Sequence, residues 1–92
     1  MGKGLNAILI HEDDNVVTVT KALTKSSIAK YHRDGKTAQV EVLDDIPAFH
    51  KIAIADIDKN GDVYKYGQLI GKALNKISAG NHVHDHNIAS PP

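Results

Sequence analysis

The chain has 92 residues and a mass of 9.9 kDa, which suits one small domain and is too short for a complete multi-domain enzyme. Eleven Lys and Arg residues balance eleven Asp and Glu residues, and only three tyrosines and one phenylalanine are present, so no nucleic-acid partner is expected. The absence of cysteine excludes disulfides, thiolate catalysis and cysteine-ligated metal clusters. We expect a single domain over residues 1–92, with a core of aliphatic side chains.

Short segments in which hydrophobic and polar residues alternate, separated by turn signals, predict an all-β fold. In chain order, the expected strands are Ala7–His11, Asn15–Thr20, Ile28–Arg33, Thr37–Leu43, His50–Ala55 and Val63–Tyr66. Asp34–Gly35 predicts a type I′ hairpin, because this dipeptide readily adopts the two positive φ angles of that turn. Ala38, Val40 and Val42 are expected to share one face of their strand.

The second half of the chain gives weaker signals. Asn60–Gly61 predicts a second hairpin-type turn. Hydrophobic residues between positions 66 and 77 recur at helical spacing, which allows one short helical turn near Ala73–Lys76. A short repeat also suggests two similar strand–turn–strand corners. In each, two hydrophobic residues stand six apart with a glycine between them, at Ile57 and Val63 and again at Ile77 and Val83.

The hydrophobic runs are too short for a membrane segment. The longest run near the N-terminus is Ala7–Ile10, whereas a signal peptide needs about 7–15 apolar residues and a membrane span about 20. We therefore expect a cytoplasmic protein that does not contact a membrane.

The histidines of His82–Asn87 carry the most informative pattern. His82, His84 and His86 stand at i, i+2 and i+4, so on an extended strand they would project from one face, with Val83 buried on the other. Such a face could hold a divalent metal or move a proton, and zinc, iron(II) and manganese all accept imidazole. The alternative is a polar strand whose histidines meet solvent or a partner chain. We expect the central His84 to matter most.

Several motifs together resemble one family. In order and spacing, the chain resembles the N-terminal module of altronate and galactarate dehydratases, an SAF-like domain with the β-clip fold, and also the small subunit of sulfolactate sulfo-lyase. Phe49 and the segment 26–28 depart from the family, which usually has glycine turns there. The matching segments are His11, Asp14–Val16, Asp44–Pro47, His50–Lys51, Ile57, Lys65–Gly67, Ile70–Gly71, Ala73, Ile77, Gly80 and His82–Asn87.

The resemblance implies a small subunit or N-terminal module of a sugar-acid hydro-lyase. Removing a proton next to a carboxylate needs a base and a stabiliser for the developing charge, and a divalent metal, iron(II) or manganese, would supply the latter. So small a core cannot enclose a sugar acid, so a large catalytic dehydratase chain is the expected partner and would hold part or most of the metal shell. The chain could also form a homo-oligomer.

The resemblance also implies roles for particular residues. His50, His82 and His84 are the expected catalytic residues, and His82, His84 and His86 the expected metal ligands. The expected substrate-binding residues are Lys51, Lys65, Tyr66 and Asn87. Two other functions stay open, namely a sulfolactate sulfo-lyase subunit and a non-catalytic SAF-type module for binding or assembly, which would have no need of three imidazoles on one face.

Overall fold

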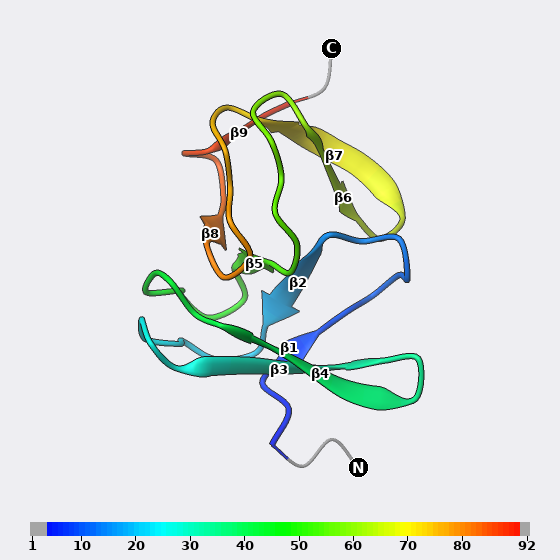
Figure 1. Ribbon diagram of the computed structural model, residues 1–92, viewed down its shortest axis with the longest axis vertical. Helices are drawn as coiled ribbons and strands as arrows, with labels where there is room; N and C mark the ends of the chain where they lie inside the picture. Colours follow the sequence, from blue (N-terminus) through cyan, green and yellow to red (C-terminus); the bar gives the residue numbers. More distant parts are fainter. Residues whose placement is uncertain (1–3, 91–92) are drawn as a thin grey trace.

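A computed structural model describes residues 4–90, and these residues form nine short strands (Figure 1). The predicted all-β fold is confirmed. Within this range no helix occurs, so none is long and apolar enough to cross a bilayer. The predicted domain also includes residues 1–3 and 91–92, which lie outside the described ones. The strands are β1 (Ala7–Ile8), β2 (Val16–Val19), β3 (Ile28–Arg33), β4 (Lys36–Glu41), β5 (Lys51–Ala53), β6 (Asp62–Lys65), β7 (Gln68–Ala73), β8 (His82–Val83) and β9 (Ile88–Ala89).

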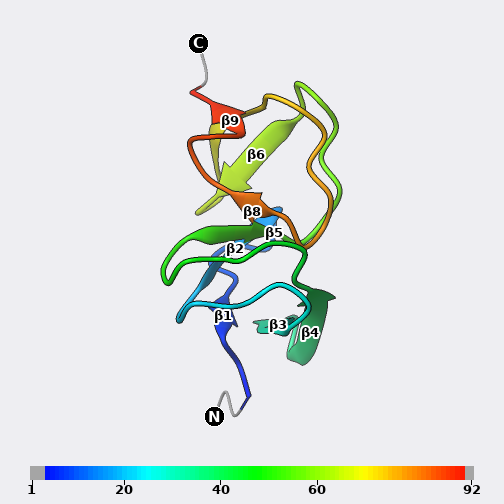
Figure 2. The ribbon, with the colours of Figure 1, turned by 90° about the vertical axis from the view of Figure 1, so that its left-hand side faces the viewer.

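A four-stranded antiparallel sheet in the order β1-β2-β5-β8 lies at the centre of the molecule. The β3–β4 hairpin lies on one side of this sheet, and the three-stranded sheet β6-β7-β9 lies on the other, as Figures 1 and 2 show. Both β5 and β8 therefore occupy the middle of the molecule, although 28 residues separate Ala53 from His82.

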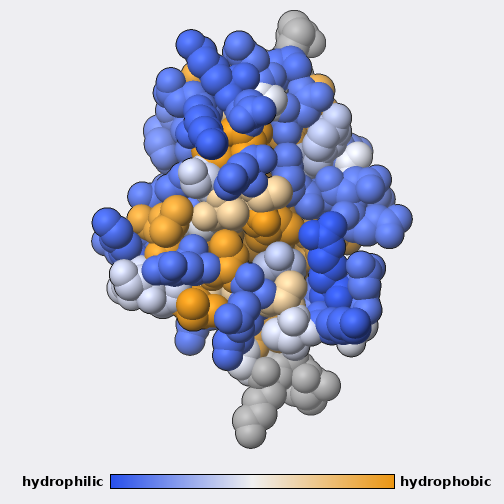
Figure 3. Space-filling model, in the orientation of Figure 1, coloured by the Kyte–Doolittle hydropathy of each residue, from blue (hydrophilic) through white to orange (hydrophobic). Residues whose placement is uncertain are grey.

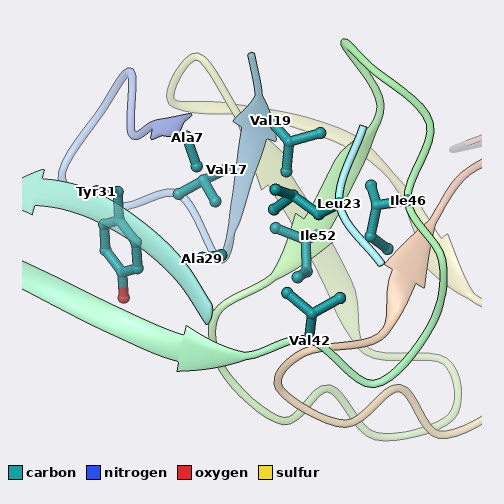
Figure 4. Close-up of a cluster of buried hydrophobic side chains, with 9 residues drawn as sticks. All are labelled: Ala7, Val17, Val19, Leu23, Ala29, Tyr31, Val42, Ile46 and Ile52. Carbon is teal, nitrogen blue, oxygen red and sulfur yellow. The ribbon is translucent and has the colours of Figure 1, made fainter. Parts of the chain in front are cut away.

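Side chains alternate between the two faces of β2, so the central sheet has a hydrophobic cluster on each side. Val17 and Val19 belong to the first cluster and Val16 to the second. Figure 4 shows the first cluster, which also contains Ala7, Leu23, Ala29, Tyr31, Val42, Ile46 and Ile52. The second cluster contains Ala53, Ile57, Val63, Ala73, Ile77 and Val83 as well. Aliphatic residues dominate both, as the composition predicts.

A repeated corner shapes the chain at four places. Each corner has a buried aliphatic residue, a positive φ three residues later and a second buried residue six residues later. The predicted two corners are confirmed, and the structure adds two more. The corner residues and the positive-φ residues are Leu23 with Ser26, Ile46 with Phe49, Ile57 with Asn60, and Ile77 with Gly80.

The corners join in pairs by backbone hydrogen bonds. Leu23 and Ile46 exchange two N–H···O bonds of 2.9 and 2.8 Å, and Ile57 and Ile77 exchange two of 2.7 and 2.8 Å. The first bridge lies before β5, and the second joins the segment after β5 to the segment before β8. Figure 3 shows that hydrophobic residues also reach the surface across the waist of the molecule, between two mostly hydrophilic ends.

The turns confirm one hairpin prediction and correct another. Asp34 and Gly35 both have positive φ, 52° and 78°, and connect β3 to β4 as expected. The Asn60–Gly61 turn is a corner rather than a hairpin, because β5 pairs with β2 and β8 and not with β6. The real hairpin turn between β6 and β7 is Tyr66–Gly67, with φ values of 57° and 70°.

The expected helical turn near Ala73–Lys76 is wrong. Gln68–Ala73 is strand β7, which pairs with β6 and β9, and the chain then enters the corner at Ile77. The hydrophobic residues recur at helical spacing because β7 has hydrophobic side chains on both of its faces and the corner then contributes one more, Ile77.

Candidate functional site

His50 reaches the histidine-rich segment through strand pairing. In β5 and β8, Lys51 pairs with Val83 and Ile52 pairs with His82, so the next position in this register sets His50 opposite His84. Side chains of directly opposed and diagonal residues in an antiparallel pair lie within reach of each other. Strand pairing therefore brings His50 to His82 and His84, although 32 positions separate His50 from His82 in the sequence.

The three imidazoles of His50, His82 and His84 form one cluster, which we call the histidine cluster. The rings of His50 and His84 stack, with centroids 4.1 Å apart, and Nδ1 of His50 lies 2.9 Å from Nε2 of His82. One ring nitrogen from each residue can be chosen so that all three lie within 4.8 Å of one another. All three side chains are half-buried.

The ring nitrogens of His50 and His82 face each other at 2.9 Å, and the tautomers of the two rings decide which one donates. Two neutral imidazoles can form this N–H···N hydrogen bond, and a cation that binds both lone pairs would replace it. Nδ1 of His84 is buried and has no hydrogen-bond partner in residues 4–90. Three imidazoles with a buried, unpartnered nitrogen among them fit a divalent metal, which imidazole ligands suit.

Burial and neighbouring charges favour the neutral forms of His50 and His82. The pKa of His82 is lowered by burial and then by the adjacent His86, His50 and His84. The pKa of His50 is lowered by burial, by His84 and by Lys51. Neutral imidazole is the form that accepts a proton or binds a metal, so these two residues are suited to either at neutral pH.

Polar side chains hold the backbone of the cluster in place. Oδ2 of Asp44 accepts hydrogen bonds from the His82 amide at 2.9 Å and from Nδ2 of Asn81 at 3.0 Å. Asn87 accepts from the His84 amide at 3.0 Å and donates to the His82 carbonyl at 2.7 Å. Sequence reasoning missed Asp44 as a support for His82, although it lies in one of the family motifs. Asn87 engages the backbone here, and its expected contact with substrate stays a prediction.

The expected extended strand over His82–Asn87 is wrong. Strand β8 ends at Val83, and a turn closed by the Asn87 amide and the His84 carbonyl follows it. Val83 is fully buried as predicted, whereas the neighbouring Asp85 is exposed. His86 is exposed, and its ring lies 5.0 Å from the His82 ring, while His50 completes the group of three.

Two lysines lie near the histidine cluster. The pKa of Lys51 is lowered by partial burial and by the positive charge of Lys65, so the two ammonium groups are close enough to repel each other. In residues 4–90 neither lysine forms an ion pair. The Lys65 Nζ lies 4.7 Å from the centroid of the exposed Tyr66 ring. An anionic ligand would relieve the repulsion between Lys51 and Lys65.

A buried carboxylate fixes the turn that presents Lys65 and Tyr66. Asp14 is only 3% exposed, and its two oxygens accept hydrogen bonds from the amides of Tyr66 at 2.9 Å, Gly67 at 2.8 Å and His11 at 3.2 Å. The loop before β2 thereby determines where the tip of the β6–β7 hairpin lies.

The family model for the altronate/galactarate dehydratase SAF domain matches residues 5–91. The chain belongs to this family. The resemblance seen in the sequence is therefore confirmed, and the four-corner β-fold is the structure of an SAF module. The histidine cluster, Asp14 and Asp44 all lie within the matched range.

Curated relatives include complete dehydratases and a subunit of another lyase. The altronate dehydratase of Bacillus subtilis (strain 168) is 41% identical over 80 residues, which cover 87% of this chain but 15% of that protein. The galactarate dehydratase (L-threo-forming) of Escherichia coli (strain K12) is 30% identical over 84 residues, 91% of this chain and 15% of that protein. The (2R)-sulfolactate sulfo-lyase subunit alpha of Chromohalobacter salexigens is 45% identical over 53 residues, 58% of this chain and 56% of that subunit. This SAF module therefore spans a small part of the dehydratases.

Proposed function

We propose that this chain is the histidine-bearing module of a sugar-acid hydro-lyase and contributes to an active site that a larger catalytic chain completes. The convergence of His50, His82 and His84 within 4.8 Å carries the proposal. The proposed reaction breaks a C–H bond next to a carboxylate and releases the neighbouring hydroxyl as water. An imidazole of the cluster is the base for that proton, because burial and its neighbours keep His82 and His50 neutral.

A divalent metal, iron(II) or manganese, is the proposed cofactor. Two imidazoles of the group His50, His82 and His84 would hold it together with groups of the larger chain, which leaves the third imidazole as the base. His86 lies outside this group and is not assigned to the metal in this proposal. When bound, the metal would supply positive charge that stabilises the carbanion formed next to the carboxylate. Lys51 and Lys65 would bind the carboxylates of the substrate, and Tyr66 would line the same side. The expected cytoplasmic location and a homo-oligomeric state stay predictions.

A second candidate is the small subunit of a sulfolactate sulfo-lyase. The 45% identity to a subunit alpha, of which the match spans 56%, favours a chain that works as a separate small subunit. A non-catalytic binding or assembly module is disfavoured, because such a module has no use for three imidazoles that converge on one point. Release of sulfite rather than water by the assembled enzyme would favour the sulfo-lyase.

A chimeric dehydratase tests the proposal. In it, this chain replaces the matching segment of the Bacillus subtilis altronate dehydratase. We expect the chimera to dehydrate altronate and the isolated chain to be folded but inactive, because the chain has the cluster but no enclosing pocket. A chimera that stays fully active with His84→Ala would contradict the role of the cluster, and turnover by the isolated chain would contradict the need for a larger chain.

Metal binding has a separate readout. Titration of the isolated chain with Mn²⁺, followed by the electron paramagnetic resonance signal of free Mn²⁺, should reveal binding that His84→Ala removes. Binding that survives this substitution would contradict the assignment of the cluster as ligands.

A further inference from the structure

Two aromatic residues have a strained backbone. Among residues 4–90, the non-glycine residues with positive φ are Ser26, Asp34, Phe49, Asn60 and Tyr66. Asn, Asp and Ser are short polar residues that tolerate this region comparatively well, whereas a bulky residue there is an outlier. Phe49 has φ 70° and Tyr66 has φ 57°. Both aromatic residues therefore adopt a conformation that favours other residue types.

The strain is unusual for its position in the fold. The residues that correspond to Phe49 in the other three corners are Ser26, Asn60 and Gly80, of which Asn60 and Gly80 are suited to positive φ and Ser26 is small. The Phe49 amide donates to the Val19 carbonyl at 2.9 Å, so the strand pairing imposes the conformation. The turn at Tyr66 is likewise imposed, by the Asp14 carboxylate. The Tyr66 ring has a local contact with the Lys65 ammonium, whereas the backbone pairing at Phe49 does not explain a bulky aromatic side chain there.

Both side chains are also exposed. Phe49 is 74% exposed and Tyr66 is 56% exposed, the two highest values among the exposed large hydrophobic residues. Packing of these two rings inside this chain therefore does not offset the free-energy cost of their backbone conformation. Residues held in such conformations persist where function needs them, and exposed aromatic residues are frequent anchors of protein interfaces.

Both aromatic residues flank the proposed active site. Phe49 directly precedes His50 of the cluster, and Tyr66 directly follows Lys65. In Figure 2, the loop that enters β5, the segment that follows β8 and the tip of the β6–β7 hairpin lie along the left-hand edge of the molecule. Phe49 and His50 belong to the first of these segments, His84 to the second, and Lys65 and Tyr66 to the third.

We infer that Phe49, with support from Tyr66, anchors the larger lyase chain at the rim of the histidine cluster. The inference rests on the proposed function. The module corresponds to 15% of the dehydratases, so most of such an enzyme lies outside this chain. A larger chain that covers this edge buries both rings and closes the histidine cluster against water at once. The surface it presents to Phe49 is an apolar pocket.

Phe49→Asn tests this inference in two settings. In the isolated chain, the substitution should raise the melting temperature by several degrees, because asparagine tolerates positive φ, as it does at position 60. In the chimera, the same substitution should lower altronate turnover by about tenfold or more, as expected for an interface anchor. Leu74→Asn is the matched control: Leu74 is a 43% exposed hydrophobic residue that directly follows β7, and its substitution should leave turnover unchanged.

Hydrogen exchange separates this inference from the proposed function. We expect the amides of residues 49–52 to be more protected in the chimera than in the isolated chain, whether or not the chimera is active. An inactive chimera with this protection would contradict the proposed function and support the anchor. No added protection, or turnover unaffected by Phe49→Asn, would overturn the anchor. Dimerisation of the isolated chain that Phe49→Asn abolishes would overturn it too, in favour of a second copy.

Discussion

At the scale of single residues, the ring nitrogens of the histidine cluster contribute little to the stability of the fold, but they can accept a proton or bind a metal. His84 buries a ring nitrogen without a hydrogen-bond partner in residues 4–90, while the adjacent Val83 is fully buried in the second hydrophobic cluster. An unpartnered polar atom does not stabilise a fold, whereas a buried methyl group does. Val83, the last residue of β8, thus serves packing, whereas we expect the next residue, His84, to serve function.

Substitutions at these two neighbours should have opposite consequences. His84→Ala should change the free energy of unfolding by less than about 1 kcal/mol and should abolish turnover by the chimera. Val83→Asp should lower the free energy of unfolding by several kcal/mol, because it buries an unpaired charge. Thermal denaturation and altronate turnover measure both effects. A tolerated Val83→Asp, with a molecule that melts after His84→Ala, would show that the histidines are structural.

The neutral histidines should also make stability depend on pH. The pKa values of His50 and His82 are lowered in the folded chain, mainly by burial. Below about pH 6.5 the unfolded chain therefore binds more protons than the folded chain, so stability should fall as the pH decreases from about 6.5 toward the lowered values. Melting curves in metal-free buffer between pH 7.5 and 5 measure this. His82→Gln should flatten the dependence, whereas substitution of the exposed His32 should not.

At the scale of elements, two loops determine where the site residues lie. The loop before β2 fixes the β6–β7 tip through Asp14, and the corner at Ile77 fixes the start of β8 through Gly80. Gly80 has φ 99°, and a Cβ there would overlap the carbonyl oxygen of Glu41. Both loops therefore have a residue whose replacement should disturb the site from a distance.

Asp14→Ala should destabilise the fold by about 2 kcal/mol, because backbone amides lose a buried acceptor. Hydrogen exchange should show faster exchange at Tyr66 and Gly67 in particular. The control is Asp13→Ala, since the Asp13 side chain is 76% exposed and should contribute less than about 0.5 kcal/mol. Equal effects of the two substitutions would contradict the structural role of Asp14.

Gly80→Ala should cost at least about 3 kcal/mol, because the new methyl group collides with the Glu41 carbonyl in addition to the backbone strain. Gly35→Ala measures the backbone strain alone, because Gly35 also has positive φ but nothing lies within 4 Å of a Cβ there. This substitution should lower the free energy of unfolding by about 1 kcal/mol. Urea denaturation of both variants measures the difference. Similar costs would show that the corner can move to accommodate a side chain.

The sequence was informative where the signal is local. Asp34–Gly35 predicted its hairpin because that dipeptide suits a type I′ turn. Tyr66–Gly67 forms the same kind of turn but escaped prediction, because tyrosine rarely adopts positive φ and an external carboxylate, Asp14, imposes it. The spacing of His82 and His84 indicated a site, but the contact with His50 depends on β5–β8 pairing, which no local pattern encodes.

At the scale of the whole molecule, the fold presents a site without enclosing it. The central sheet lies between two hydrophobic clusters, so its faces are occupied and functional side chains are confined to an edge. The histidine cluster forms where β5 pairs with β8, the last strand of that sheet. The proposed larger chain would supply the second surface of a pocket, in agreement with the small share of the dehydratases that this module spans.

The claim that His50, His82 and His84 act as one site is tested most directly by comparing two chimeras. One carries His84→Ala and the other carries His86→Ala, and altronate turnover is measured for both. His84 belongs to the group of three within 4.8 Å, whereas His86 is exposed outside it. We predict that His84→Ala lowers turnover by at least about 100-fold and that His86→Ala changes it by less than about threefold, with both proteins folded. Full activity of the His84→Ala chimera, or equal losses in the two variants, would contradict the claim that His50, His82 and His84 act as one site.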